Sequence, residues 1–216
     1  MTIESVRKAK EKADSFIVTF EDGTEIKVNA AQIADYGIYN EREFTQEEFA
    51  QLNEGLENSA SKARALRILG SRNLSANEIE KRLIGRGESA QTARNTALWL
   101  EEMGYLNDEE YAKSIVRHYA TKGYGAARIK SELFRRGIKR EIWEDALQNI
   151  NVEETEDAAY NYVVSRLKGS ASKEDLRRVT DALCRRGYNY EEARTAVNRY
   201  KDTIGENGET GQWEEE

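Results

Sequence analysis

Apolar residues recur along this chain at a spacing of fifty positions. Leu83, Leu133 and Leu183 each follow an apolar residue four positions earlier, and each precedes an arginine and a glycine. The full set adds Ile79, Ile129, Val179, Arg86, Arg136, Arg186, Gly87, Gly137 and Gly187. A four-residue spacing is typical of the buried face of a helix. A period of fifty residues indicates helical units that stack and share a continuous core, so we predict a mainly α fold of tandem three-helix repeats in an elongated array.

The region before the repeats has a different pattern. Apolar residues alternate over 16–20 and again at Ile26 and Val28, and Asp22-Gly23 lies between the two runs, which predicts a β-hairpin. Thr45 to Glu48 has the sequence of a capping box and predicts the start of a helix that runs to about Asn58. We therefore expect a small N-terminal extension made of a β-hairpin and a helix.

These patterns divide the chain into five segments. The predicted segments are the N-terminal extension at 1–60, three-helix repeats at 61–107, 108–151 and 152–201, and a disordered acidic tail at 202–216. Within the repeats, Ser75 to Glu78 forms a second capping box and Asn107 begins the second repeat.

Glycine is expected to end the helices, because the sequence contains no proline. The predicted helix-stop residues are Gly87, Gly104, Gly137 and Gly187. We predict positive φ at Gly137 and Gly187, each of which follows Arg-Arg. Arginines in the last helical turn also complement the negative end of a helix, so this motif has a sufficient structural explanation. The same arginines recur on one face of each repeat and can also form a basic row, and the two interpretations are compatible.

Charge is segregated along the chain, although the net charge is −7. Residues 111–140 contain nine Lys or Arg side chains and one acid, Glu132, whereas residues 1–60 and 201–216 are acidic. A basic segment of this density predicts an anionic partner, and the alternative is an ordinary solvated helix surface. The candidate partner-binding residues are Lys122, Tyr124, Arg128, Lys130, Arg135, Arg136, Arg185 and Arg186. Residues 122–125 are expected to form a flexible loop with an aromatic tip, too short for a phosphate-binding loop.

Catalytic chemistry has little support in the sequence. His118 is the only histidine, and we expect it to lie on the surface. Cys184 is the only cysteine, and we expect apolar packing for it, as for Ile84 and Phe134 at the equivalent positions. We therefore expect no enzyme activity, no metal and no cofactor. A single cysteine fits a reducing compartment, and the absence of an apolar run of membrane length predicts a cytoplasmic protein that does not contact a membrane.

The middle of the chain resembles the RecX family of bacterial regulatory proteins. The resemblance rests on Gly104-Tyr105-Leu106-Asn107-Asp108, Tyr111-Ala112, residues 122–133 from Lys-Gly-Tyr-Gly to Glu-Leu, and Arg136-Gly137-Ile138. It extends over about residues 61–200. Position 126 often holds proline in the family and is Ala126 here, and both residues suit the first turn of a helix.

The resemblance implies a cytoplasmic modulator of the RecA recombinase. RecX proteins bind the RecA nucleoprotein filament and restrain its growth and its ATP-dependent activities, and the family has no agreed catalytic residues. By this resemblance we expect a monomer that binds the RecA filament and inhibits it in DNA repair and the SOS response, with single-stranded DNA in the filament as a further contact. The alternative is a helical-repeat protein that binds DNA directly.

Overall fold

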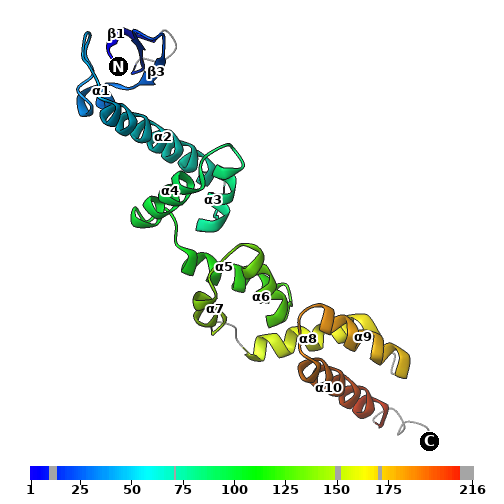
Figure 1. Ribbon diagram of the computed structural model, residues 1–216. Helices are drawn as coiled ribbons and strands as arrows, with labels where there is room; N and C mark the ends of the chain where they lie inside the picture. The colour runs from blue at the N-terminus through cyan, green and yellow to red at the C-terminus, as the bar shows by residue number, and fades with distance from the viewer. Residues whose placement is uncertain (10–13, 71, 149–151, 170–171, 210–216) are drawn as a thin grey trace, which may run out of the picture. The chain divides into compact units, whose positions relative to one another are not determined.

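The computed structural model describes residues 1–9, 14–70, 72–148, 152–169 and 172–209. Within these ranges three strands precede ten helices (Figure 1). The strands are β1 (Ile3–Lys8), β2 (Phe16–Phe20) and β3 (Glu25–Val28). The helices are α1 (Ala30–Asp35), α2 (Gln46–Leu69), α3 (Ala76–Ile84), α4 (Ala90–Glu102), α5 (Asp108–Thr121), α6 (Ala126–Arg135), α7 (Arg140–Leu147), α8 (Val152–Leu167), α9 (Lys173–Arg185) and α10 (Tyr190–Glu209). The predicted mainly α fold is confirmed.

The chain forms two compact units. The first contains the sheet, α1 and α2, and the second contains α5 to α10, while α3 and α4 are divided between the two. None of the helices in the described ranges is both long and apolar enough to cross a membrane. The division into three repeats stays a prediction.

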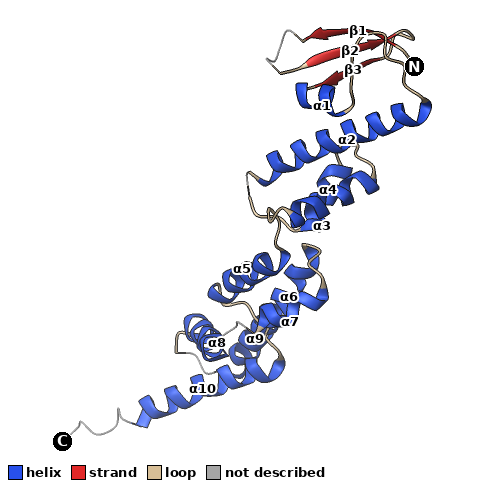
Figure 2. Cartoon of the chain, turned by 90° about the vertical axis from the view of Figure 1, so that its left-hand side faces the viewer, coloured by secondary structure: helices blue, strands red, loops and turns tan. Residues whose placement is uncertain are grey.

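The N-terminal sheet has one strand more than predicted. β1, β2 and β3 are antiparallel in that order, with Val6 opposite Val18 and Val18 opposite Ile26 (Figure 2). The Asp22-Gly23 turn between β2 and β3 is present, and Gly23 has a φ of 85°. β1 escaped the sequence pattern because only Ile3 and Val6 are apolar in it. Such a strand is recognisable only through its partner.

The core of the sheet rests on α2. The buried cluster consists of Ile3, Val18, Phe20, Val28, Ile38, Phe44 and Leu52. The ring of Phe20 meets the ring of Phe49 edge to face at 5.2 Å, a favourable aromatic geometry. A small sheet is stable only when its apolar face is buried, and this contact with the helix buries it.

Helix α2 is longer than predicted. It begins at the expected capping box, in which Thr45 Oγ1 accepts from Glu48 N at 3.2 Å and Glu48 accepts from Thr45 N at 2.8 Å. It then continues past Asn58 to Leu69 and through the proposed boundary at residues 60 and 61. Ser61 is buried there and accepts a hydrogen bond from Thr96 at 2.8 Å. This bond and the absence of a helix breaker explain the longer helix.

Each of the last two predicted repeats has its own apolar cluster. That of α5 to α7 consists of Ala112, Ile115, Val116, Ile129, Leu133, Ile138 and Ala146. That of α8 to α10 consists of Ala159, Val163, Leu167, Val179, Leu183, Tyr188, Ala193, Ala196, Val197 and Tyr200. The leucine and its apolar neighbour four positions earlier are buried in both clusters, as the fifty-residue period predicts.

Helix α10 extends beyond the predicted end at about Tyr200. It reaches Glu209, so the expectation of disorder is wrong for residues 202–209. Two residues anchor the added segment 201–209. Ile204 packs against the α8–α10 cluster, and the hydroxyl of Thr203 lies 3.3 Å from Tyr160 Oη. Residues 210–216 lie outside the described residues.

The predicted helix-stop glycines are confirmed. Gly87, Gly104, Gly137 and Gly187 have φ values of 93°, 72°, 71° and 95°. At all four, the backbone N–H of the next residue also closes the turn, with N–O distances of 2.8 to 3.2 Å. The donor and acceptor pairs are Glu88 N and Leu83 O, Tyr105 N and Leu100 O, Ile138 N and Leu133 O, and Tyr188 N and Leu183 O. This is the hydrogen-bonding pattern of a helix that ends in a left-handed residue.

Candidate partner-binding surface

The middle helix of the second predicted repeat presents a basic face to solvent. α6 starts after Gly125, whose backbone is extended at φ −77° and ψ 166°. Ile129 and Leu133 lie one turn apart and are fully buried. Positions rotated away from this pair must therefore point to solvent.

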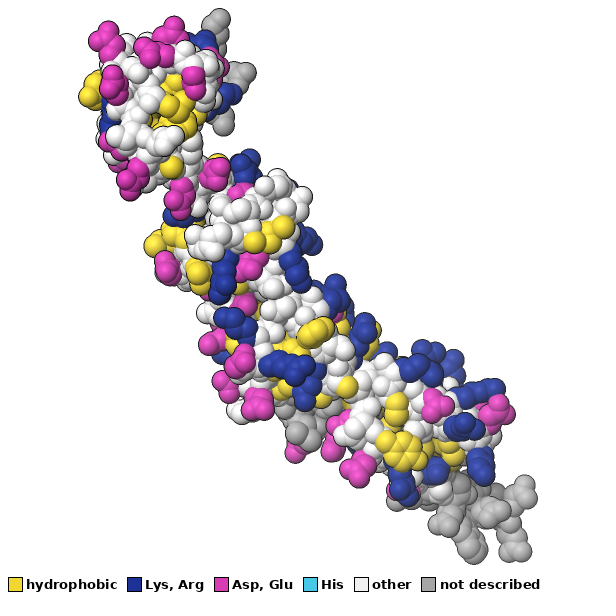
Figure 3. All heavy atoms as spheres, in the orientation of Figure 1, with side chains coloured by type: hydrophobic (Ala, Val, Ile, Leu, Met, Phe, Trp, Pro, Cys, Tyr) yellow, Lys and Arg dark blue, Asp and Glu magenta, His cyan; other side chains and the backbone are white. Residues whose placement is uncertain are grey.

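Four exposed side chains define a surface that we call the α6 face: Arg128, Lys130, Phe134 and Arg135. Phe134 is 68% exposed, an unusual environment for a large aromatic residue, whose burial is strongly favourable. On the side of the molecule drawn in Figure 3, Lys and Arg side chains gather over the repeats that contain α6 and α9, whereas acidic side chains surround the sheet. The α6 face therefore combines positive charge with an exposed aromatic ring.

The expectation that Ile84, Phe134 and Cys184 pack inward is wrong. Ile84 is 45% exposed, and Cys184 is exposed as well. Each of these residues follows the buried leucine of its repeat by one position, and one helical step turns a side chain by about 100° away from the core. This rotation is the signal that could have identified Phe134 as a surface residue.

Glu132 is the single acid of the basic segment, and it is buried at 4% exposure. Arg135 donates to it from Nε at 2.9 Å and from Nη2 at 2.6 Å, and Arg136 donates from Nε at 2.7 Å. The hydrogen bond from Arg135 is the largest cause that lowers the pKa of Glu132 from 4.5 to about 2, against the opposing effect of burial. One buried carboxylate thus partly neutralises two arginines.

The stability of the protein is expected to depend on this carboxylate at acid pH. Because the folded pKa is lowered, the contribution of Glu132 is complete above pH 4.5 and is lost as the pH falls to about 2. A shift of this size corresponds to about 3 kcal/mol at neutral pH. Urea unfolding at several pH values measures this contribution. Between pH 4.5 and 2, the free energy of unfolding should change less with pH for Glu132→Gln than for the parent. Parallel curves would contradict the prediction.

Backbone hydrogen bonds link the start of α6 to the turn after α9. The turn after α9 lies against the start of α6: Gly125 N donates to Arg186 O and Ala127 N donates to Gly187 O, both at 3.0 Å. The two backbones approach so closely that a Cβ at Gly125 would lie 2.3 Å from Gly187 O. We call this contact the α6–α9 joint.

The side chain of Arg186 completes the α6–α9 joint. It donates to Lys122 O at 2.7 Å and to Gly123 O at 3.1 Å. Its guanidinium also lies 4.6 Å from the ring centre of Tyr124 and 4.7 Å from that of Tyr162. Cation–π contacts at partly buried sites contribute about 0.5–2 kcal/mol.

The turn after α6 makes the corresponding contact with the start of α3. Ser75 Oγ donates to Arg136 O at 2.5 Å, and a Cβ at Gly137 would lie 2.4 Å from Asn77 Oδ1. The Arg136 side chain donates to Tyr111 Oη and lies 3.8 Å from Glu78. The Arg-Arg-Gly turn thus has the same role twice, as the element that contacts the middle helix of the preceding predicted repeat.

These contacts divide the predicted binding residues into two groups. Lys122, Arg128, Lys130, Arg135 and Arg185 have exposed side chains. Tyr124, Arg136 and Arg186 are half-buried in contacts between helices. The expectation of a free aromatic tip at Tyr124 is wrong, because its ring packs on Tyr119 at 5.4 Å and under Arg186.

Conventional catalytic groups do not converge near this surface. His118 is exposed, as expected, and its ring lies 5.6 Å from that of Tyr119. Among the described residues, no group of three or more His, Cys, Asp or Glu side chains is arranged to hold a metal ion.

The sequence matches a known family in the same region. The family described as "RecX, second three-helix domain" matches residues 107–147. The chain is 26% identical over 189 residues to the regulatory protein RecX of Caldanaerobacter subterraneus subsp. tengcongensis, which covers 88% of this chain and 95% of that protein. It is 31% identical over 137 residues to the regulatory protein RecX of Stenotrophomonas maltophilia, which covers 62% of this chain and 83% of that protein.

Two solved structures share the fold. A crystal structure of regulatory protein RecX superposes with a TM-score of 0.74 at 16% identity, over 91% of this chain and 98% of the other. A crystal structure of RecX from Lactobacillus salivarius gives a TM-score of 0.62 at 21% identity, over 67% of this chain and 97% of the other. From the sequence relatives and this shared fold, we conclude that the chain belongs to the RecX family of regulatory proteins.

Proposed function

We propose that this chain binds the nucleoprotein filament of the RecA recombinase and restrains its assembly and ATP-dependent activities in recombination and DNA repair. It acts in the cytoplasm as a monomer and has no catalytic residues of its own. Support comes from the family, whose members are named regulatory proteins, and from the chemistry of the α6 face.

The observation that carries the proposal is the exposure of Phe134 on the same helix as the exposed Arg128, Lys130 and Arg135. Aromatic and arginine side chains are enriched in the centres of protein interfaces. Arginine binds carboxylates through two parallel hydrogen bonds, and basic side chains around an apolar anchor accelerate association with an acidic partner. Arg135 remains 69% exposed at its side chain although it pairs with Glu132.

Titration of the full chain into preformed RecA filaments on single-stranded DNA tests this function. ATP hydrolysis by the filament should fall as the chain is added, because a bound modulator restrains filament growth. Hydrolysis that stays unchanged at saturating chain would contradict the proposal.

Direct DNA binding is the alternative function. The combination of an exposed aromatic ring with basic side chains on α6 favours it. The start of a helix is the usual phosphate site, but here the amides of the N-cap Gly125 and of Ala127 already donate to the turn after α9. Salt separates the two functions. Affinity for DNA alone should fall steeply with salt, whereas affinity for a filament with protein contacts should fall less.

Phe134→Ser should weaken filament binding without unfolding the chain. An aromatic anchor at an interface contributes about 2 kcal/mol or more, whereas an exposed residue contributes within about 0.5 kcal/mol to folding. The matched control is Tyr190→Ser, because Tyr190 is 65% exposed at the start of α10. Equal filament affinities of the two variants would show that Phe134 is not an anchor.

A further inference from the structure

A separate pocket lies between α8 and α10 in the last predicted repeat. Its volume is about 220 Å³, which is smaller than typical sites for drug-sized ligands. The lining residues from α8 include Thr155 and Glu156, and those from the turn before α10 and its first turns include Tyr188, Glu191 and Glu192. The size of the pocket suits a single side chain.

The pocket is acidic. Among the described residues that line it, three are glutamates and Arg199 is the single cation. Arg199 is already paired with Asp157 at 2.6 Å and lies 4.3 Å from the ring centre of Tyr160. Its ion-pair partner Asp157 does not line the pocket, and three glutamates against one paired arginine leave the lining with a negative balance.

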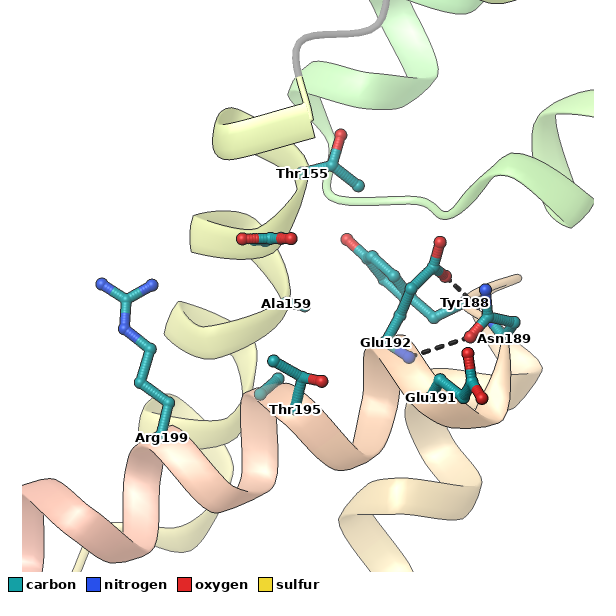
Figure 4. Close-up of a pocket in the computed structure, with 10 residues that line it drawn as sticks. Thr155, Ala159, Tyr188, Asn189, Glu191, Glu192, Thr195 and Arg199 are labelled. Atoms are coloured by element: carbon teal, nitrogen blue, oxygen red, sulfur yellow. Dashed lines mark hydrogen bonds between the residues drawn. The ribbon is translucent and has the colours of Figure 1, made fainter.

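Tyr188 gives the pocket an unused hydrogen-bonding group. The residue is 3% exposed, and its hydroxyl has no hydrogen-bond partner in the described part of the chain. Figure 4 shows the ring reaching from the turn before α10 into the space between Thr155 and Glu192. A buried hydroxyl without a partner destabilises the fold, so a ligand that hydrogen-bonds to it recovers this loss.

Burial raises the pKa of the Tyr188 hydroxyl, and the charge of Glu192 acts in the same direction, whereas Arg186 opposes them. The hydroxyl therefore stays protonated at neutral pH and can accept as well as donate a hydrogen bond.

These polar groups replace apolar residues of the preceding repeat. In the fifty-residue register, Tyr188 and Glu192 correspond to Ile138 and Ile142 of the preceding repeat. Ile138 is buried and Ile142 packs against the apolar cluster of α5 to α7. The same place in the fold is therefore apolar in one repeat and acidic in the next.

We propose that the α8–α10 pocket binds a guanidinium group, namely an arginine side chain of a partner polypeptide. The lining glutamates come from both α8 and the first turn of α10, and no described group of acids is arranged for a metal ion. Guanidinium has five N–H donors in a plane and meets dispersed acceptors better than a compact cation does. The inference concerns a different surface from the α6 face and does not depend on the binding of RecA.

The test is a titration of the full, isotopically labelled chain with N-acetyl-arginine methylamide, followed by amide chemical shifts. Shifts are expected at Tyr188, Glu192 and Thr195, with saturation in the millimolar range. The citrulline analogue, which is isosteric and neutral, and the lysine analogue should both bind more weakly. No shifts up to about 50 mM, or equal affinity for the citrulline or lysine analogue, would overturn the proposal.

Two variants sharpen this test. Tyr188→Phe removes only the hydroxyl and should lower the affinity for the arginine probe by about 2- to 10-fold. Glu192→Gln removes the charge but preserves a side-chain acceptor for Asn189 N, which Glu192 binds at 2.7 Å. It should also weaken binding, whereas Asp181→Asn on the exposed surface of α9 should not. Equal affinities for all three variants and the parent would overturn the assignment.

Discussion

Gly187→Ala is expected to destabilise the protein by about 2–4 kcal/mol. The residue has a φ of 95°, so any side chain costs about 1 kcal/mol in backbone strain. A Cβ there would also lie 2.4 Å from Arg128 N, and relief of such a backbone clash costs about 1–3 kcal/mol more. Urea unfolding followed by circular dichroism measures the loss.

Gly87→Ala is the matched control, because Gly87 occupies the equivalent position two repeats, or one hundred residues, earlier. Its φ is 93°, and a Cβ there would meet nothing within 4 Å. This variant should lose only the strain of about 1 kcal/mol. Equal losses in the two variants would mean that the close approach of α9 to α6 does not contribute to stability.

The α6–α9 joint also connects stability to the candidate surface. The turn at Gly187 lies against the backbone of Arg128, and Arg128 belongs to the α6 face. Packing at this turn therefore positions the first basic side chain of the face. We expect a variant of the joint to lose part of its filament affinity even though it alters no exposed residue.

Much of the fold could be predicted from the sequence, because its signals are local. The capping boxes at Thr45 and Ser75 and the glycines after each middle helix act within a few residues, and each was confirmed. The apolar pair at Ile129 and Leu133 likewise identifies its buried face. Local hydrogen bonds and helix periodicity leave direct traces in a sequence.

The remaining features depend on contacts between distant residues. Arg136 and Arg186 were predicted as partner contacts, yet their partners lie about sixty positions away, at Ser75 and Gly123. β1 pairs with β2 although it has little apolar pattern, and the acidic α8–α10 pocket depends on two helices meeting. No local sequence pattern marks such pairs. Only the structure therefore shows which residues contact another helix and which are exposed.

The largest functional effect is expected for Arg128→Glu combined with Lys130→Glu. Both side chains are exposed on α6, so the reversal should leave folding intact. Each lost charged contact costs about 1.5–3 kcal/mol, and the new carboxylates repel an acidic partner. Binding to RecA filaments should weaken by at least about 100-fold. The matched control is Arg194→Glu with Lys201→Glu, which makes the same charge change on the exposed side of α10.

The affinity of these two double variants and the parent for preformed RecA filaments tests the account most directly. It can be measured by fluorescence anisotropy of the labelled chain at physiological salt, with circular dichroism to confirm folding. We predict that the α10 double variant binds like the parent and that the α6 double variant loses most of its affinity. A folded α6 double variant that binds as tightly as the parent would contradict the central claim that the α6 face contacts the filament.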